Sequence, residues 1–170
     1  MSAQRDLEVR AAQVGSLLTA AGLTLTTAES CTGGGIAQAA TAIAGSSAWF
    51  DRGFVTYSNA AKTEMLAVPR QLLDRHGAVS EEVVRAMVQG ALAASSADWA
   101  VAVTGIAGPG GGSADKPVGT VWLAWRQRGG LDWVECAHFQ GDRAAIREQT
   151  VKRVFDVLIE RLDCSGVAEG

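Results

Sequence analysis

A serine and a lysine stand where the chain could carry out nucleophilic catalysis. Ser30 lies in ESCTGGG (29–35), a turn between a strand-like run and an alanine-rich stretch, where a hydroxyl is well exposed to a substrate. A serine needs a base to take its proton. Lys62 follows YSN (57–59), near the start of an expected helix, where the helix dipole disfavours an ammonium. Burial beside a pocket would lower its pKa further, so Lys62 is a candidate general base, although an exposed surface lysine also fits the local sequence.

Other nucleophiles and bases are less well placed. Cys31 adjoins Ser30, and its thiol is either a rival nucleophile or a small buried hydrophobe. Adjacent residues point in different directions, so we expect only one of the two to face a pocket. The histidines, His76 and His138, fall outside the glycine-rich loops. A Ser-His-Asp arrangement therefore has no support in the sequence.

Three further polar residues end strands or begin helices. Tyr57 ends an expected strand and could orient Lys62 or share a proton with it, or it could be a core aromatic. Thr104 ends a buried strand and could offer its hydroxyl to the same pocket, although strand propensity alone explains a threonine there. Arg143 follows Gly141 at an expected helix start, where it either binds a phosphate or carboxylate or is a solvated residue of the first turn.

Glycine is enriched, with 20 in 170 residues, or about 12% against a usual 7%. The residues cluster at 33–35 and 105–112, and glycine lets a backbone approach a ligand closely. The Walker pattern is absent because no glycine precedes a lysine, and the dinucleotide pattern fails where Gln38 stands in place of its last glycine. What remains is a glycine turn leading into a helix. Such a turn favours an anion or a developing oxyanion, but tight packing would also explain it.

The pattern of the chain predicts one domain over residues 1–170, with its core at about 5–162. Helices alternate with strands first, and a hairpin comes late, which predicts a three-layer α/β/α sandwich on a mixed, mostly parallel sheet. We expect helices at 5–21, about 35–43, 59–66, 69–76, 80–92 and 142–162, and strands at 23–28, 53–57, 99–104, 118–125 and 131–139.

Ligands bind outside the carboxyl ends of the strands in open α/β sheets. Three loops that follow expected strands are rich in small and polar residues: 29–35, 57–62 and 104–113. We therefore expect them to wall one pocket.

Composition excludes several classes of protein. The formal net charge of −3 and the pI of about 5.4 argue against a surface that coats nucleic acid. No run approaches the roughly 18 apolar residues of a membrane span, and the polar start is no signal peptide, so we expect a soluble, cytoplasmic protein without membrane contact. The three cysteines form neither a disulfide framework nor a zinc pattern, and no metal site is expected.

Lysine is scarce, with only Lys62, Lys116 and Lys152 among the 15 basic residues. Because arginine supplies nearly all the positive charge, a lone lysine at position 62 is harder to explain as a solvated surface group. Only lysine can give up its proton and act as a base.

Longer strings closely resemble the CinA C-terminal-domain family. The resemblance covers nearly the whole chain, about residues 5–162, and the motifs that carry it are specific in combination. The chain resembles the stand-alone form, without the molybdopterin-binding-like N-terminal domain of longer members. The strings are TTAESCTGG (26–34), IAGSSAWF (43–50), GFVTYSN (53–59) followed by Lys62, HGAVS (76–80), TGIAGP (104–109), KPVGTV (116–121) and GDR (141–143).

The resemblance implies a nicotinamide-nucleotide amidohydrolase of pyridine-nucleotide salvage. Such an enzyme converts nicotinamide mononucleotide and water to nicotinic acid mononucleotide and ammonia, without metal or cofactor. The resemblance also implies the same three-layer fold and a homo-oligomer, with a dimer expected. Ser30 matches the family nucleophile and Lys62 its base, while Tyr57 matches the family tyrosine. The substrate-binding residues we expect are Cys31, Thr32, Gly33, Gly34, Ser47, Thr104, Gly105 and Arg143.

From these residues we hypothesise a mechanism in which Lys62 takes the proton of Ser30, which attacks the carboxamide carbon. The N–H groups of 31–34 would stabilise the oxyanion, while Arg143 and the loop after Thr104 would anchor the phosphate. The alternative is a catalytically silent CinA-like module that binds a nucleotide or a partner. The complete set of serine, tyrosine and lysine argues against it, because a binding module has no need of a lysine at a helix start.

Overall fold

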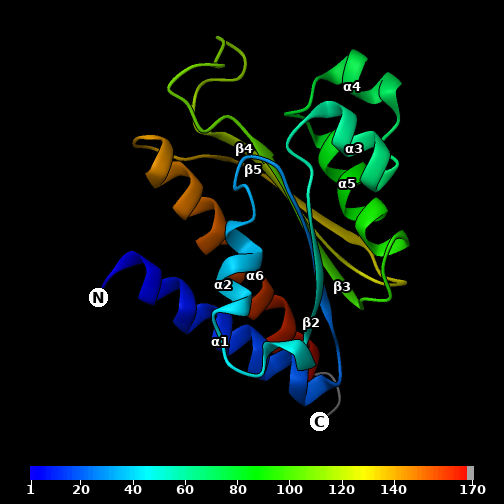
Figure 1. Cartoon of the computed structure of the whole chain (residues 1–170), viewed down its shortest axis with the longest axis vertical. Helices are drawn as coiled ribbons and strands as arrows, with labels where there is room; N and C mark the ends of the chain where they lie inside the picture. Colours follow the sequence, from blue (N-terminus) through cyan, green and yellow to red (C-terminus); the bar gives the residue numbers. More distant parts are fainter. Residues whose placement is uncertain (168–170) are drawn as a thin grey trace.

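A five-stranded sheet lies between two layers of helices (Figure 1). The computed structural model of the chain describes residues 1–167. The strand order is β2-β1-β3-β4-β5; the first three strands run parallel, and the last two are antiparallel additions. The predicted three-layer fold with a mixed, mostly parallel sheet is therefore confirmed. The strands are β1 (Leu25–Glu29), β2 (Phe50–Val55), β3 (Trp99–Gly105), β4 (Thr120–Gln127) and β5 (Asp132–His138).

The helices divide between the two faces of the sheet. One face is covered by α1 (Ala3–Ala21), α2 (Gly35–Thr41) and α6 (Arg143–Val167), and the other by α3 (Asn59–Leu66), α4 (Arg70–His76) and α5 (Glu81–Ala93). Strand alternation explains the division, because successive side chains point to opposite faces. In β3, Val101 and Val103 face the first group of helices, whereas Ala100 and Ala102 face the second. The small alanines let α5 lie close to the sheet.

Two element boundaries differ from the prediction by three residues or more. Strand β2 begins at Phe50 rather than at residue 53. The prediction places its start too late because the exposed Asp51 and Arg52 interrupt the apolar pattern at the edge of the sheet. Helix α6 continues to Val167 rather than ending at residue 162. Residues 163–166 are exposed, so no apolar stripe marks this extension of the helix in the sequence.

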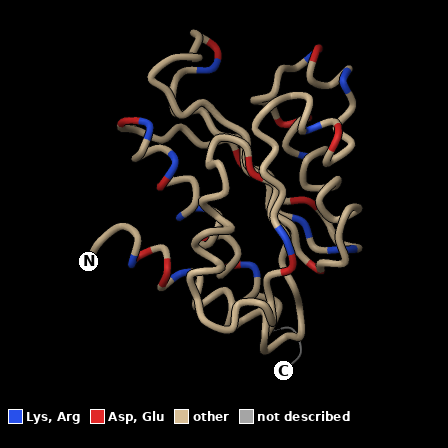
Figure 2. Tube along the Cα trace, in the orientation of Figure 1, with Lys and Arg blue, Asp and Glu red and all other residues tan. Residues whose placement is uncertain are grey.

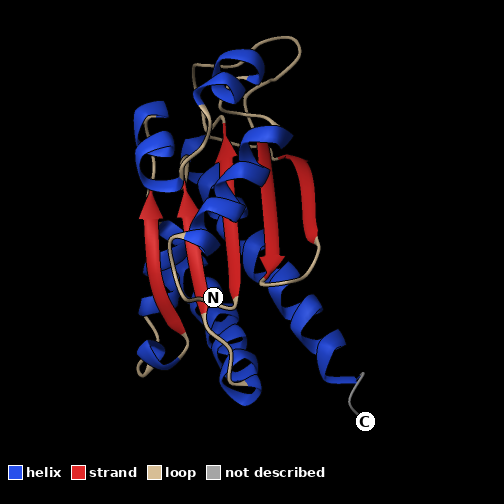
Figure 3. Ribbon diagram, turned by 90° about the vertical axis from the view of Figure 1, so that its right-hand side faces the viewer, coloured by secondary structure: helices blue, strands red, loops and turns tan. Residues whose placement is uncertain are grey.

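The parallel strands end at one edge of the sheet. Figure 3 shows their three arrows pointing to the same end of the molecule. Ser30 directly follows β1, the connection to α3 follows β2, and a long loop leaves β3 at Gly105. The predicted convergence of the three loops at the carboxyl edge follows from this topology.

Charged residues are dispersed over the outer helices and loops (Figure 2). Within residues 1–167, acidic and basic positions are interspersed along the trace of these elements. None of the helices within residues 1–167 is both long enough and apolar enough to cross a membrane.

The position of α3, which carries Lys62, depends on a glycine of α5. A Cβ atom on Gly90 would lie 2.0 Å from the carbonyl oxygen of Leu66, the last residue of α3. A carbonyl oxygen of the backbone cannot move aside as a flexible side chain can. Gly90 is therefore required for the close approach of α5 to α3.

Gly90→Ala should lower the free energy of unfolding by about 1–3 kcal/mol, because the added methyl group forces the two helices apart. Urea denaturation measures the effect. Gly166→Ala is the matched control: Gly166 is also helical but has no neighbouring heavy atom within 4 Å of an added Cβ. That control should be neutral or up to about 1 kcal/mol stabilising. Equal stability of the two variants would contradict the packing argument.

Candidate active site

Ser30 and Lys62 meet at the carboxyl edge of the sheet. Ser58 caps α3 by accepting a hydrogen bond from the Ala61 amide, which places Lys62 in the first turn of the helix as predicted. Its Nζ lies 3.0 Å from the Oγ of Ser30. Lys62 is 1% exposed and Ser30 is 7% exposed. The nucleophile and base proposed from the sequence are thus within hydrogen-bond distance in a nearly dry environment.

The surroundings of the Lys62 amine favour its neutral form. Its polar contacts within residues 1–167 are all to uncharged oxygen atoms: besides Ser30, it donates to the carbonyl oxygens of Thr56 at 2.9 Å and Tyr57 at 3.4 Å. Burial lowers the pKa of Lys62, because the charged form loses its hydration. A neutral amine has two N–H groups, and the two carbonyls use both. Its lone pair is then left to accept the proton of Ser30.

Cys31 is a poor rival for the role of nucleophile. Both Cys31 and Ser30 line the same cavity, contrary to the expectation that only one of them would. The Cys31 side chain is nevertheless 5% exposed and packs in the core cluster beneath α1, α2 and α6. Burial raises the pKa of the thiol to about 11, so the reactive thiolate is scarce at neutral pH. This position fits the alternative in which Cys31 is a small buried hydrophobe.

Glu29, which the sequence analysis missed, organises the turn that carries Ser30. Its buried carboxylate accepts hydrogen bonds from the Thr32 hydroxyl at 2.6 Å and from the amides of Ile36 at 2.8 Å and Ala37 at 3.0 Å. The amino end of α2 is therefore occupied by the chain's own carboxylate. The amides of Ile36 and Ala37 are therefore not free for a substrate anion, and of the turn's two open interpretations this part of it fits tight packing.

The turn itself retains three amides without an acceptor among residues 1–167. Gly33 donates its N–H to the carbonyl oxygen of Ser30 at 3.0 Å, so this amide is not available to an oxyanion as expected. Gly33 and Gly34 adopt positive φ angles of 59° and 101°, which gives both glycines a structural reason. The amides of Cys31, Thr32 and Gly34 have no acceptor among residues 1–167. They are the donors that remain for a ligand.

Arg147 contacts this turn from α6. Its Nε donates to the carbonyl oxygen of Cys31 and its Nη2 to that of Thr32, both at 3.1 Å. Nothing in the local sequence pattern singled out this arginine, because its partners are backbone atoms more than a hundred residues away. The GDR string (141–143) ends at Arg143, one helical turn earlier on α6.

Ser30 and Lys62 open into a cavity of about 270 Å³. The three predicted loops meet around it, with the loop after β3 forming one wall and Arg143 part of the rim. Among the described residues, no group of three or more His, Cys, Asp or Glu side chains is arranged to hold a metal ion.

Tyr57 and Arg143 meet at the rim of this cavity. Tyr57 is 62% exposed, and its hydroxyl accepts a hydrogen bond from Arg143 Nη2 at 3.0 Å. Arg143 Nη1 donates to the carbonyl oxygen of Gly108 at 2.8 Å. The phenol does not contact Lys62, contrary to expectation; only the carbonyl of Tyr57 reaches that amine, because the side chain turns outward from the end of the strand.

The other expected binding residues differ in whether they line the cavity. Thr104 and Gly105 line the cavity, but the Thr104 hydroxyl donates to the carbonyl oxygen of Ala78 at 2.9 Å. Thr32 uses its hydroxyl on Glu29, so only its amide remains. Ser47 does not join the cavity: it is exposed in the short 3-10 helix Ser46–Ala48 before β2, at the opposite edge of the sheet from Ser30.

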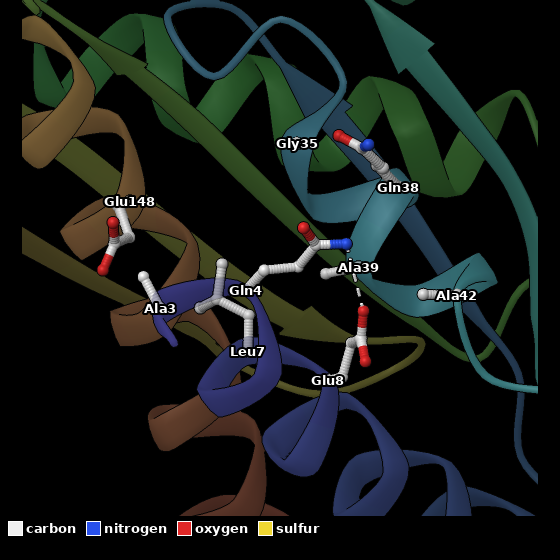
Figure 4. A pocket seen from close by; sticks show the side chains of 9 residues that line it. All are labelled: Ala3, Gln4, Leu7, Glu8, Gly35, Gln38, Ala39, Ala42 and Glu148. Carbon is white, nitrogen blue, oxygen red and sulfur yellow. Dashed lines mark hydrogen bonds between the residues drawn. The ribbon is translucent and has the colours of Figure 1, made fainter. Parts of the chain in front are cut away.

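A second hollow lies between α1, α2 and α6 (Figure 4). Its volume is about 360 Å³. Figure 4 shows Gln4 of α1 donating to Glu8, and Gln38 on α2 across from them. It contains no pairing of a nucleophile with a base, so the chemistry of the Ser30 cavity has no counterpart there.

Known proteins resemble the chain over most of its length. The family profile described as "CinA C-terminal domain" matches residues 7–162. "Nicotinamide-nucleotide amidohydrolase PncC" from Pseudomonas putida is 61% identical over 136 residues, which cover 80% of this chain and 84% of that protein. The protein of the same name from Escherichia coli K12 is 57% identical over 148 residues, covering 86% and 88%.

A solved structure supports the same relationship. The competence/damage inducible protein CihA from Agrobacterium tumefaciens superposes with a TM-score of 0.90 at 50% sequence identity, covering 93% of this chain and 96% of that one. The profile match, the sequence identities and the shared fold agree. The chain therefore belongs to the CinA C-terminal domain family.

Proposed function

We propose that the chain hydrolyses the carboxamide of nicotinamide mononucleotide to give nicotinic acid mononucleotide and ammonia, with Ser30 as nucleophile and Lys62 as general base. The observation that carries this proposal is the 3.0 Å approach of Lys62 Nζ to Ser30 Oγ at the floor of a cavity. The printed names of the relatives at 61% and 57% identity support the choice of substrate. The reaction fits a place in pyridine-nucleotide salvage.

The first half of the reaction forms an acyl-enzyme. Neutral Lys62 takes the proton of Ser30 as Oγ attacks the carboxamide carbon, and the former carbonyl oxygen becomes an oxyanion. The free amides of Cys31 and Thr32 donate to it; one such donor typically lowers the barrier by about 3 kcal/mol. Protonated Lys62 then returns its proton to the departing nitrogen, which leaves as ammonia.

The second half regenerates the enzyme. Water attacks the ester carbon while Lys62 accepts a proton from it. The ester bond to Ser30 breaks, nicotinic acid mononucleotide leaves, and the proton on Lys62 returns to the Ser30 oxygen. The same amine thus serves as base and acid in both halves, which requires a pKa below the ordinary value of lysine.

Arg143 is our proposed anchor for the substrate phosphate, together with the loop after Thr104. Within residues 1–167 its guanidinium contacts only uncharged oxygen atoms, those of Gly108 and Tyr57. No carboxylate neutralises its charge there, so a phosphate at the rim would gain a direct ion pair.

The alternative function, a catalytically silent binding module, does not explain why Lys62 is buried. Burying a lysine without a carboxylate destabilises the fold, and a module that only binds a nucleotide gains nothing from it. A base that must be neutral near physiological pH does require such a site.

Ser30→Ala should lower kcat for ammonia release from nicotinamide mononucleotide by at least about 10³-fold, because the acyl-enzyme can no longer form. Cys31→Ala, which keeps the backbone amide, should lower kcat by less than about tenfold. An enzyme-coupled ammonia assay on both folded variants distinguishes the two nucleophiles. An active Ser30→Ala beside an inactive Cys31→Ala would reverse the assignment.

The dependence of kcat/KM on pH should reflect the protonation state of Lys62. kcat/KM should rise with pH as the amine loses its proton, with a midpoint below 10.5, the ordinary pKa of lysine, because burial lowers the folded value. Lys62→Met should reduce kcat/KM by at least about 10³-fold. A flat profile up to the pH at which the chain unfolds would contradict the role of base.

The same pKa shift predicts an effect on stability. Between the folded pKa of Lys62 and 10.5 the unfolded chain binds more protons, so stability should rise with pH through that window. Below the folded pKa of Lys62, the buried ammonium lowers the free energy of unfolding by its full amount. Lys62→Met should therefore be more stable than the unsubstituted chain at neutral pH, by a margin that shrinks as the pH approaches 10.5. Urea denaturation at several pH values measures it; a less stable variant at neutral pH would argue against a desolvated amine.

A further inference from the structure

Arg147 fixes the orientation of the peptide groups that follow the nucleophile. It donates from Nε to the carbonyl oxygen of Cys31 and from Nη2 to that of Thr32, each at 3.1 Å. These are its polar contacts within residues 1–167. The guanidinium is half-buried against the turn and does not line the cavity into which Ser30 opens.

The geometry of the peptide group links these carbonyls to the free amides. In a trans peptide plane the C=O and the N–H point in opposite directions. The Cys31 carbonyl shares its plane with the Thr32 amide, so holding that oxygen on Arg147 turns the Thr32 N–H away from the guanidinium. The Ser30 carbonyl, held by the Gly33 amide at 3.0 Å, directs the Cys31 N–H in the same manner. Both amides are left without an acceptor among the described residues.

We propose that Arg147 is a positioning residue that builds the oxyanion site from outside the cavity. It holds the carbonyl side of the turn so that the amide side stays free for the oxyanion. This inference rests on the proposed function, because it assigns a role in the same reaction.

The positive charge of Arg147 strengthens the same amide. A hydrogen bond from a cation to a carbonyl oxygen is stronger than one from a neutral donor, and it polarises the peptide group. The N–H at the other end of that group becomes a better donor. The benefit grows as negative charge develops on the reacting oxygen, so Arg147 acts chiefly on the transition state.

The turn does not depend on Arg147 alone for its fold. Glu29 holds it from the other side through the Thr32 hydroxyl and two amides of α2, and Gly33 closes it through Ser30. A variant without the guanidinium should therefore fold, while its free amides become less well oriented.

Arg143 provides a matched comparison one helical turn earlier on α6. It contacts the rim at Gly108 and Tyr57, where we place the substrate phosphate, whereas Arg147 contacts the nucleophile turn. Two arginines four residues apart should thus affect different kinetic constants. Loss of Arg143 should weaken substrate binding, and loss of Arg147 should slow the chemical step.

The experiment measures ammonia release from nicotinamide mononucleotide by the unsubstituted chain, Arg147→Met and Arg143→Met. Arg147→Met should lower kcat by about 10²-fold, with KM within about threefold. Arg143→Met should raise KM by at least about tenfold, with a much smaller change in kcat. Calorimetric titration with nicotinic acid mononucleotide should give Arg147→Met nearly the affinity of the unsubstituted chain, because the ground state does not require the oxyanion donors.

Chemical rescue distinguishes positioning from a general structural role. Millimolar methylguanidinium should restore part of the kcat of Arg147→Ala, whereas Arg147→Lys should stay slow because a single ammonium is a poor match for two carbonyl oxygens. Urea denaturation of each variant checks that the fold is kept.

The outcomes separate this inference from the proposed function. An unsubstituted chain that releases no ammonia would overturn both. If that chain is active, an undiminished kcat in Arg147→Met would overturn the role of Arg147 alone. So would a loss of kcat that is accompanied by an equal loss of product affinity and is not rescued by methylguanidinium.

Discussion

Among the residues that the structure describes, the amine of Lys62 lies buried against Ser30 without a carboxylate partner, and the rest of the site depends on this arrangement. Such an amine is unstable as a cation, which makes it a ready acceptor for the serine proton. Holding it there requires the start of α3, the carbonyl groups of Thr56 and Tyr57, and the close crossing of α3 and α5 at Gly90. Elements far from this pair thus fix the distance between Ser30 and Lys62, the proposed nucleophile and base.

Backbone groups bind the other two charged side chains near the turn, Glu29 and Arg147, and neither of them bonds to Lys62. Glu29 binds N–H groups at the start of α2, and Arg147 binds carbonyl oxygens of the adjacent turn. If the Glu29 carboxylate instead faced the amine, it would stabilise the ammonium and remove the base. Within residues 1–167 the turn between these two charges keeps the amides of Cys31, Thr32 and Gly34 free, and the proposed mechanism uses those of Cys31 and Thr32 for the oxyanion.

Much of this arrangement is predictable from the sequence, and what is not has a physical reason. Apolar strand runs separated by helical spacings indicate the layered fold, and the scarcity of lysine together with its place after a helix cap indicates Lys62 as partner of Ser30. Glu29 and Arg147 leave no such pattern, because their partners are backbone atoms brought near only by folding. The outward turn of the Tyr57 side chain is equally invisible, since the sequence gives its place at the end of a strand but not its rotamer.

The central claim is that turnover passes through an ester on Ser30. The most direct measurement is an acid quench of the chain during turnover of nicotinamide mononucleotide, followed by proteolysis and mass spectrometry. We expect the peptide containing Ser30 to carry the nicotinic acid mononucleotide acyl group, with fragmentation placing it on the serine, and the same adduct in Cys31→Ala. An adduct on Cys31, or ammonia release with no covalent adduct at any quench time, would contradict the account.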